Sequence, residues 1–261
     1  MRSDPTEVDV TRLALADACL FLDLDGTLAP LRASPGDVRP SADCNRLLRA
    51  ACEALAGRVA IVSGRTIESI DAILEGACRA VAGVHGLQRR RADGVYEATA
   101  PHPRVAHAAQ VMAAFAEAHP GLLVEHKDQS AALHYRGAPK AEAAVMEFVR
   151  RLAETEALQI QPGHMVMELR TPGPDKGAAV RAFLAEVPFR GATPIYVGDD
   201  LTDEAGFAEA ARHGGIGILV GRDGPTLATA QLESVAEVLA WLDLSLSRGA
   251  FHIKRTLSWA A

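Results

Sequence analysis

Short, continuous apolar runs alternate with amphipathic stretches in both halves of the chain. Ala18–Leu22, Val59–Val62 and Ala80–Ala82 are typical of strands buried in a parallel sheet, and Pro194–Gly198 and Gly217–Val220 repeat the pattern. Apolar residues at helical spacing predict helices between and after these strands, over 41–55, 66–74, 176–185, 202–211 and 235–242. This repetition predicts an α/β fold with a doubly wound, Rossmann-like parallel sheet.

The pattern changes in the middle of the chain. Residues 84–99 are predicted to form a polar hairpin, and Pro101 and Pro103 then mark a boundary. Two helices (104–119 and 140–154) and four strands (near 121–125, 131–135, 158–160 and 164–169) follow, up to a turn-rich segment at 171–175. We therefore expect a core of residues 1–103 and 171–261, interrupted by a smaller inserted α/β domain of residues 104–170.

The charge balance narrows the class of partner. The chain has 27 basic and 33 acidic residues and a formal net charge of −6, with both signs scattered. Nucleic-acid binding usually needs a clustered basic face, so we expect no nucleic-acid partner. Aromatic residues make up only 5% of the chain, which predicts a core rich in Ala, Val and Leu and few rings for stacking.

The cysteines and the chain's apolar runs bear on its location. The four cysteines contain no C-x-x-C pair, which favours free thiols over a disulfide framework or a zinc site. The first residues lack the basic and apolar segments of a signal peptide, and no apolar run approaches the roughly 20 residues that span a bilayer. We expect a soluble cytoplasmic protein without a membrane partner; a monomer is possible, and the oligomeric state stays open.

The first motif with chemistry is Asp23-Leu24-Asp25-Gly26-Thr27, which directly follows a predicted strand. The carboxyl ends of strands form the usual ligand edge of an open α/β sheet. One of its two carboxylates could attack phosphorus while the other handles the proton of the leaving group. An Asp-rich turn with an Asp cap is the alternative.

A second acidic motif, Gly198–Glu204, follows another predicted strand. Asp200 or Thr202 could cap the next helix, but capping does not explain Asp199 together with Asp23 and Asp25 at neighbouring strand ends. Two such carboxylates ~4 Å apart repel by about 4 kcal/mol at an effective dielectric of 20. Their convergence calls for a cation, and an all-oxygen ligand set with a phosphate substrate favours Mg²⁺.

Two further positions could bind a phosphate. Ser63-Gly64-Arg65 follows a strand and begins a helix, where a hydroxyl and a helix N-terminus suit a phosphate oxygen, although Ser63 could equally be a helix cap. Lys176 begins another helix and offers a positive charge, although a single lysine there is usually solvated.

Taken together, D-x-D-G-T, S-G-R, a lysine and G-D-D-x-x-D resemble the haloacid dehalogenase superfamily of phosphotransferases. Dehalogenases themselves lack the acid represented by Asp25, and P-type pumps need transmembrane helices. The likeness to the trehalose-6-phosphate phosphatase family is more specific and covers about residues 17–245, including that family's α/β cap domain between the Ser63 and Lys176 motifs. It rests on Asp23–Pro30, Ser63–Arg65, Ala82–Gly86, Ala132–Arg136 and Gly198–Glu204.

The resemblance implies roles in the core. Asp23 would be the nucleophile that forms an aspartyl-phosphate, and Asp25 the general acid and base. Ser63, Gly64 and Lys176 would hold the phosphoryl group, with Lys176 also neutralising charge during transfer. Mg²⁺ would be held by Asp23, the backbone carbonyl of Asp25 and Asp199, with support from Asp200 and Asp203.

The resemblance also implies a sugar-binding set. Its members are Arg65, His85, Glu125, Lys127, Arg136 and Glu168. Without the resemblance, the cap residues would be interpreted as exposed cross-strand ion pairs of Glu125 with Lys127 or Arg136. One departure concerns Gly163, which the family usually follows with lysine; here His164 follows it, which puts sugar affinity in doubt.

We therefore expect a Mg²⁺-dependent phosphatase that hydrolyses trehalose 6-phosphate to trehalose and phosphate, in trehalose biosynthesis. A phosphatase for sucrose 6-phosphate or mannosyl-3-phosphoglycerate is the nearest alternative, because such enzymes share the core motifs. A non-catalytic sugar-phosphate-binding partner of a synthase is an alternative of another class.

Overall fold

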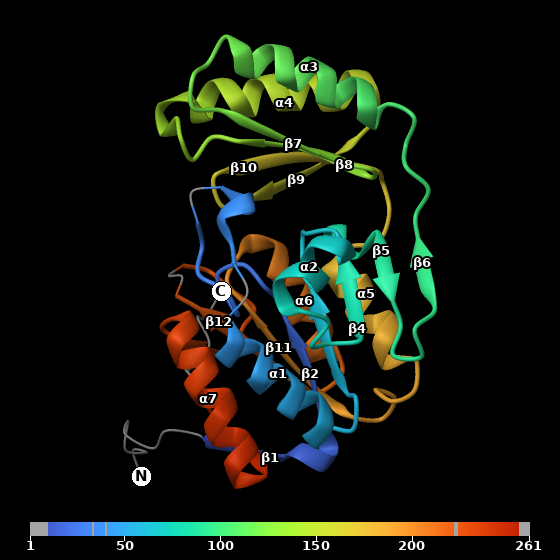
Figure 1. The fold of residues 1–261 in the computed structure, drawn as a ribbon, viewed down its shortest axis with the longest axis vertical. Helices are drawn as coiled ribbons and strands as arrows, with labels where there is room; N and C mark the ends of the chain where they lie inside the picture. Colours follow the sequence, from blue (N-terminus) through green and yellow to red (C-terminus); the bar gives the residue numbers. More distant parts are fainter. Residues whose placement is uncertain (1–9, 33, 40, 222–223, 256–261) are drawn as a thin grey trace, which may run out of the picture.

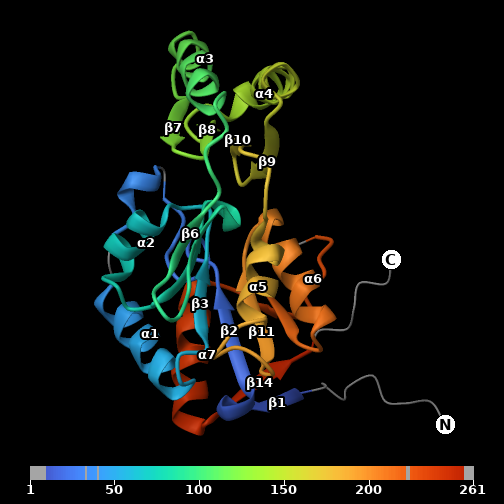
Figure 2. The ribbon, with the colours of Figure 1, turned by 90° about the vertical axis from the view of Figure 1, so that its right-hand side faces the viewer.

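The structure is a computed structural model that describes residues 10–32, 34–39, 41–221 and 224–255. It has a larger lower lobe and a smaller upper lobe stacked along the long axis (Figure 1). The upper lobe comprises residues 105–170, and the lower lobe comprises the rest of the described chain. Two connecting segments, 99–104 and 171–175, cross between them (Figure 2).

An eight-stranded sheet forms the centre of the lower lobe, in the order β13-β12-β11-β2-β3-β4-β5-β6. The strands from β13 to β4 are parallel, and β5 and β6 continue the sheet as an antiparallel hairpin. They are β2 (Ala18–Leu22), β3 (Val59–Val62), β4 (Ala80–Gly83), β5 (Gln88–Arg90), β6 (Tyr96–Ala98), β11 (Thr193–Gly198), β12 (Ile216–Val220) and β13 (Ala230–Leu232).

Helices cover both faces of this sheet. Apolar residues of one face pack against α1 (Ala42–Ala54), α2 (Ile67–Leu74) and α7 (Val235–Arg248). The other face packs against α5 (Lys176–Leu184) and α6 (Glu204–Arg212). Strand β2 is buried along its whole length because both of its faces are covered, which explains its continuous apolar run.

The order of the strands determines where a ligand can bind. From β2 the chain adds β3 and β4 on one side, and it later adds β11, β12 and β13 on the other. The strand order therefore reverses between β2 and β11, and the crevice beyond their carboxyl ends is where open α/β sheets bind ligands. Asp23 directly follows β2 and Asp199 directly follows β11.

The upper lobe is a two-layered α/β unit. Its antiparallel sheet has the order β7-β8-β10-β9, and α3 (Val105–Glu117) and α4 (Glu142–Glu156) cover the face turned away from the lower lobe (Figure 1). Its strands are β7 (Leu123–Lys127), β8 (Ser130–His134), β9 (Gln159–Gly163) and β10 (Val166–Arg170). Alternation along β10 places Met167 and Leu169 in the lobe's own core, which leaves Glu168 on the opposite face of the sheet.

Three strands were not expected from the sequence. Strand β1 (Val10–Ala14) pairs with β14 (Ala250–Lys254) as a separate two-stranded sheet, and β13 extends the edge of the central sheet. Most of β14 lies in the C-terminal stretch from residue 251, and the residues beyond 255 lie outside the described part of the chain. All four cysteines are free, as expected.

Candidate active site

The loop after β2 positions the two leading carboxylates. Backbone N–H groups of Thr27, Leu28 and Ala29 all donate to the carbonyl of Leu24, which turns the chain sharply beyond Asp23. Gly26 has φ +80°, and a Cβ atom there would lie 1.9 Å from a carboxylate oxygen of Asp199. Glycine is therefore required at Gly26 because the side chain of Asp199 occupies that space.

Three carboxylates converge at the crevice. One oxygen from each of Asp23, Asp199 and Asp203 lies within 4.8 Å of the others. Burial and the neighbouring carboxylates raise the pKa of Asp23 to about 7, although the charge of Lys176 opposes this shift. Burial and the carboxylates of Asp23 and Asp203 raise the pKa of Asp199 to about 9. An oxygen-only group of this kind has the chemistry of a site for a hard divalent cation.

Lys176 supplies the buried positive charge of the site. Its Nζ atom lies 3.1 Å from Asp23 Oδ1 and 2.7 Å from Asp203 Oδ1, and the residue is 2% exposed. Although burial opposes the charged form, the two carboxylates raise the pKa of Lys176 well above its usual value. The solvated surface lysine that the sequence also allowed is therefore wrong, since the helix N-terminus at Lys176 faces the crevice.

Asp203 organises the loop between β11 and α6. Its Oδ1 accepts hydrogen bonds from Lys176 and from the Tyr196 hydroxyl, both at 2.7 Å. Its Oδ2 accepts from the backbone N–H groups of Asp199, at 3.1 Å, and Asp200, at 3.0 Å. Because both oxygens are occupied by protein donors, Asp203 holds Lys176 and the backbone that carries Asp199 in place.

Asp25 and Asp200 have hydrogen-bond partners outside the acidic group. The Asp25 carboxylate is bound by the Arg65 guanidinium, which also donates to the carbonyl of Pro35 at 2.9 Å. Asp200 caps the 3₁₀ turn Leu201–Asp203 and accepts from the backbone N–H of His164 in the upper lobe, at 3.2 Å. In this structure the side chain of Asp200 thus connects the two lobes.

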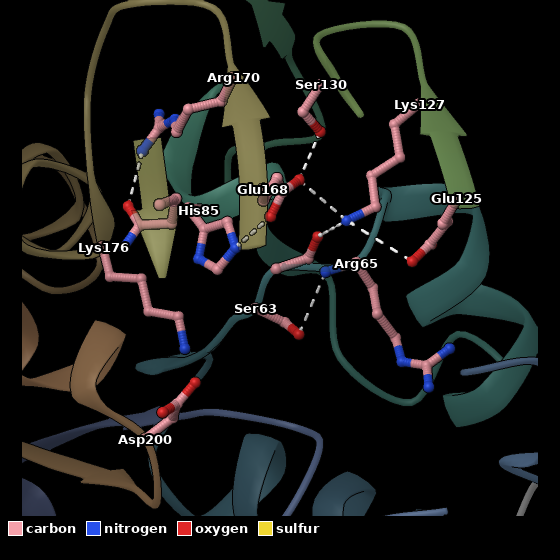
Figure 3. Close-up of polar contacts among 12 residues, drawn as sticks. Ser63, Arg65, His85, Glu125, Lys127, Ser130, Glu168, Arg170, Lys176 and Asp200 are labelled. Atoms are coloured by element: carbon pink, nitrogen blue, oxygen red, sulfur yellow. Dashed lines mark hydrogen bonds and ion pairs between the residues drawn. The ribbon is translucent and has the colours of Figure 1, made fainter. Parts of the chain in front are cut away.

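Ser63 and Gly64 lie directly beyond β3, which neighbours β2, the strand that Asp23 follows. The Ser63 side chain is buried, and its hydroxyl accepts from the backbone N–H of Arg65 at 3.4 Å (Figure 3). Ser63 does not cap the following helix, because α2 begins two residues after Arg65 and Thr66 caps it through Ser69 N. The alternative interpretation of Ser63 as a cap is therefore wrong.

The upper lobe contributes a charged cluster that faces this edge. Lys127 Nζ donates to Glu168 at 3.1 Å and to the Gly64 carbonyl at 3.0 Å, and it lies 3.9 Å from Glu125 (Figure 3). Burial would raise the pKa of Glu168, but Lys127 and His85 outweigh it and hold this pKa below its usual range. The exposed ion pair that the sequence also allowed is wrong for Lys127, whose side chain is only 7% exposed.

Arg136 lies at the rim of the same region. Its guanidinium donates to the carbonyl of Arg32 in the lower lobe and, at 3.3 Å, to that of His164 in the upper lobe. Glu125 pairs with His134 at 3.0 Å and not with Arg136. The ion pair of Glu125 with Arg136, one of the two expected alternatives, is therefore absent.

These groups line one cavity between the lobes. Its volume is about 140 Å³, and its lining includes Asp23, Asp25, Ser63, Gly64, Arg65, His85, Glu125, Lys127, Arg136, His164, Glu168, Lys176, Asp199 and Asp200. Asp203 lies behind it, buried beneath Lys176.

The sequence profile of the trehalose-phosphatase family matches residues 21–235. The chain belongs to the trehalose-phosphatase family. A trehalose-6-phosphate phosphatase of Escherichia coli (strain K12) is 37% identical over 227 residues, which cover 86% of this chain and 85% of the relative. A probable trehalose-phosphate phosphatase of Sinorhizobium fredii is 39% identical over 208 residues, 77% of each protein. The family expected from the sequence motifs is thereby confirmed.

Solved structures confirm the fold class. A trehalose-6-phosphate phosphatase related protein has a TM-score of 0.74 at 25% identity and covers 88% of this chain and 98% of its own. The C-terminal domain of the C. albicans trehalose-6-phosphate phosphatase has a TM-score of 0.79 at 21% identity and covers 89% and 92%. The fold is that of the haloacid dehalogenase superfamily, with a mostly parallel central sheet.

This member of the trehalose-phosphatase family has site residues to which the sequence gave no role, although His134 lies within the Ala132–Arg136 motif. The Ser130 hydroxyl donates to Glu168, His134 binds Glu125, and the Tyr196 hydroxyl binds Asp203. Tyr196 lies inside an apolar strand, so the sequence pattern did not predict a hydrogen-bond partner for its hydroxyl. Strand β8 pairs with β10, so Ser130 lies opposite Arg170, two residues along β10 from Glu168. This tertiary contact is encoded by no local pattern.

The length and polarity of a helix decide whether it could span a membrane. Among the described residues, none of the helices is both long and apolar enough to cross a bilayer.

Proposed function

We propose that this protein is a Mg²⁺-dependent phosphatase that converts trehalose 6-phosphate to trehalose and phosphate through an aspartyl-phosphate. The observation that carries the proposal is one cavity with two kinds of lining. Asp23, Lys176 and Asp199 lie on its lower side, and the charged cluster of Glu125, Lys127 and Glu168 lies on its upper side. The first kind suits phosphoryl transfer, and the second suits a ligand with many hydroxyl groups.

Asp23 and Asp25 divide the chemistry. One carboxylate oxygen of Asp23 attacks phosphorus, the bond from phosphorus to the sugar oxygen breaks, and Asp25 gives that oxygen its proton. A water molecule then attacks the phosphorus of the aspartyl-phosphate and passes a proton to Asp25. The acyl-phosphate bond breaks, so that phosphate leaves and both carboxylates return to their first state.

The metal-binding part of the proposal rests on the carboxylate group. Asp23, Asp199 and the backbone carbonyl of Asp25 would hold Mg²⁺, and Asp200 and Asp203 would support this group from the same loop. The raised pKa values of Asp23 and Asp199 fit a site that is short of positive charge. When bound, the ion neutralises charge on the phosphoryl oxygens.

Ser63, Gly64 and Lys176 would bind the transferred phosphoryl group. Lys176 is held by Asp23 and Asp203, so its ammonium is already in place and loses little freedom when phosphate binds. Ser63 and Gly64 line the same cavity. Since both sit directly after β3, the rigid sheet fixes their distance from Asp23.

The sugar would be bound by Glu125, Lys127, Arg136 and Glu168, with Arg65 and His85 on the lower side. We propose that residues 104–170 act as a cap domain over a catalytic core of residues 1–103 and 171–261. The cavity of about 140 Å³ is smaller than the ~300–1,000 Å³ of typical ligand pockets. The lobes must therefore separate to admit a disaccharide phosphate and close again for the reaction.

A phosphatase for another sugar phosphate is the nearest alternative. A sucrose-phosphatase from Synechocystis, solved in complex with sucrose and phosphate, has a TM-score of 0.53 at 15% identity, which shows the shared fold alone. The upper-lobe residues, rather than the catalytic carboxylates, would separate these substrates. A non-catalytic partner of a synthase is disfavoured by the complete set of Asp23, Asp25, Lys176 and Asp199.

The proposal extends to the setting of the reaction. The substrate is a small molecule, and we expect neither nucleic acid nor a membrane as a partner. The free thiols of all four cysteines fit the reducing environment of the cytoplasm. A monomer suffices for the proposed chemistry, because every residue assigned to it comes from one chain.

Metal-dependent phosphate release tests the enzymatic part. We expect phosphate release from trehalose 6-phosphate with Mg²⁺, loss of the reaction with EDTA, and recovery when Mg²⁺ is added in excess. Acid-quenched protein should carry a phosphoryl group on Asp23 during turnover. Binding of the sugar phosphate without any metal-dependent release would favour the non-catalytic partner instead.

A further inference from the structure

His85 forms a direct polar contact between the two lobes. Its Nε2 atom lies 3.0 Å from Glu168 Oε2, and both residues are buried, at 9% and 4% exposure (Figure 3). His85 belongs to the 3₁₀ turn Val84–Gly86 after β4, and Glu168 belongs to β10 of the upper lobe. The contact therefore joins the edge that carries the catalytic groups to the sheet that faces it.

The backbone holds His85 in an unusual conformation. Val84 and His85 have φ values of +46° and +53°, in the left-handed region that a β-branched residue such as valine strongly avoids. The Val84 N–H donates to the Arg65 carbonyl at 2.8 Å, and the His85 N–H donates to the Ser63 carbonyl at 3.0 Å. These two hydrogen bonds to the S-G-R motif hold the strained backbone of Val84 and His85 in place. Backbone strain of this kind is concentrated at functional sites.

The imidazole ring lies directly on Gly64. A Cβ atom at Gly64 would lie 2.6 Å from Nε2 and 2.7 Å from Cε1 of His85. Glycine in the S-G-R motif is thereby explained, because any side chain would displace this ring. With the strained backbone behind it and Gly64 beneath it, the ring of His85 has little freedom to move.

The bond also fixes the tautomer of His85. A carboxylate can only accept hydrogen bonds, so the proton of the neutral ring is assigned to Nε2, and Nδ1 is a bare acceptor. Nδ1 is buried and has no hydrogen-bond partner among the residues described. The ring therefore presents its one N–H group to Glu168.

The contact lies close to the segments that join the lobes. Gly86, next to His85, packs so closely on the connecting segment that a Cβ atom there would lie 2.6 Å from the Asp175 carbonyl oxygen. Glu168 precedes the same segment by three residues. Contacts beside a hinge move least when two lobes separate, whereas the long side chain of Lys127 can leave the Gly64 carbonyl for a ligand.

We propose that His85 is a positioning residue for Glu168, and that their hydrogen bond is the fixed contact about which the upper lobe closes. This inference rests on the proposed function, since it sets where the carboxylate that binds the sugar stands relative to Ser63 and Lys176. The Lys127 bond to Gly64 is the exchangeable contact, which the sugar replaces.

A matched pair of substitutions isolates the hydrogen bond. H85Q and H85M have unbranched side chains of similar length and carry the same backbone strain, but only glutamine offers an N–H group near the position of Nε2. H85N is a third variant; asparagine tolerates positive φ best among non-glycine residues, and its amide is too short to reach Glu168. All three leave Asp23, Lys176 and Asp199 unchanged.

Kinetics on two substrates provide the first readout. We expect H85M and H85N to lower kcat/KM for trehalose 6-phosphate about 10- to 100-fold, chiefly through KM, as the loss of a hydrogen bond to a charged group predicts. H85Q should stay within about threefold of the unaltered protein on the same grounds. Turnover of p-nitrophenyl phosphate, which has no sugar, should fall much less than turnover of trehalose 6-phosphate in H85M and H85N. Equal values for H85M and H85Q, or a parallel loss on both substrates, would overturn the proposal.

Hydrogen exchange without substrate provides a second readout that does not depend on the substrate assignment. The backbone N–H groups of Thr99 and Thr171, which bond to Leu87 and Gln129 at the two connecting segments, should exchange faster in H85M and H85N than in H85Q. If trehalose 6-phosphate is not a substrate but this difference is seen, the proposed function fails while the positioning role stands. Uniform exchange in all variants would refute the positioning role.

Discussion

The guanidinium of Arg65 binds both carboxylate oxygens of Asp25, with Nε at 2.6 Å from Oδ2 and Nη2 at 2.8 Å from Oδ1. The same Nη2 atom donates to the Pro35 carbonyl at 2.9 Å, on the segment that borders the cavity. Paired, charge-assisted bonds of this kind are strong and fix the orientation of the carboxylate. To act as a general acid, Asp25 must free one oxygen for a proton when substrate binds, so Arg65 has to yield one of its two bonds.

R65K tests this relationship. Lysine keeps the charge but cannot form the paired contact, so Asp25 loses its fixed orientation. We expect kcat to fall about 10- to 100-fold, in the range of general acid–base contributions, with a smaller change in KM. R46K, at an exposed position, is the control. A rise in KM alone would mean that Arg65 serves only the sugar and does not orient Asp25.

Replacement of the nucleophile by its amide should remove turnover without loss of the fold. D23N keeps the size of the side chain but removes the attacking oxygen, so we expect a drop in kcat of about three orders of magnitude or more. D17N changes an exposed aspartate of the same lobe and should leave turnover unchanged. Residual activity of D23N near that of D17N would exclude Asp23 as the nucleophile.

Loss of the buried ammonium should affect stability as well as activity. K176M leaves Asp23 and Asp203 buried without their counter-charge, and breaking such a pair costs about 3–5 kcal/mol. For a chain of this length the melting temperature should fall by roughly 6–20 °C. K140M, at an exposed position, should melt like the unaltered protein. Equal melting of K176M and K140M in calorimetry would contradict the buried ion-pair network.

Magnesium binding should strengthen as pH rises. In the metal-free protein the pKa of Asp23 is raised to about 7 and that of Asp199 to about 9, so both groups hold protons that a cation must displace. A raised carboxyl pKa favours the folded state at low pH, and this contribution is lost as pH rises through the folded value. We therefore expect Mg²⁺ to raise the melting temperature more at pH 9 than at pH 6. An increase that does not depend on pH would contradict this proton–metal exchange.

The sequence predicted the fold well where patterns are local. The run Ala18–Leu22 forms a strand with those same bounds, because a strand covered on both faces must be apolar throughout. Strand β1, in contrast, pairs with residues some 240 positions later, and its partly exposed residues show no apolar run. Pairing over such a distance leaves no local signal.

The same distinction applies to the site. Asp23, Ser63 and Asp199 could be predicted because each follows a buried strand of one sheet, and such strands end at a common edge. Burial of Lys176 could not, since a helix N-terminus is as often solvated, and only the position of α5 beneath the crevice decides it. The bond between His85 and Glu168 joins residues 83 positions apart, on different lobes.

A comparison of kcat/KM among three sugar phosphates tests the central claim most directly. Phosphate release should be measured with purified protein and Mg²⁺ on trehalose 6-phosphate, sucrose 6-phosphate and glucose 6-phosphate. We expect kcat/KM for trehalose 6-phosphate to exceed the other two by about 100-fold or more, since a site built to bind sugar hydroxyls discriminates strongly against ligands that leave its polar groups unpaired. Equal values for the three substrates would contradict the assignment of trehalose 6-phosphate.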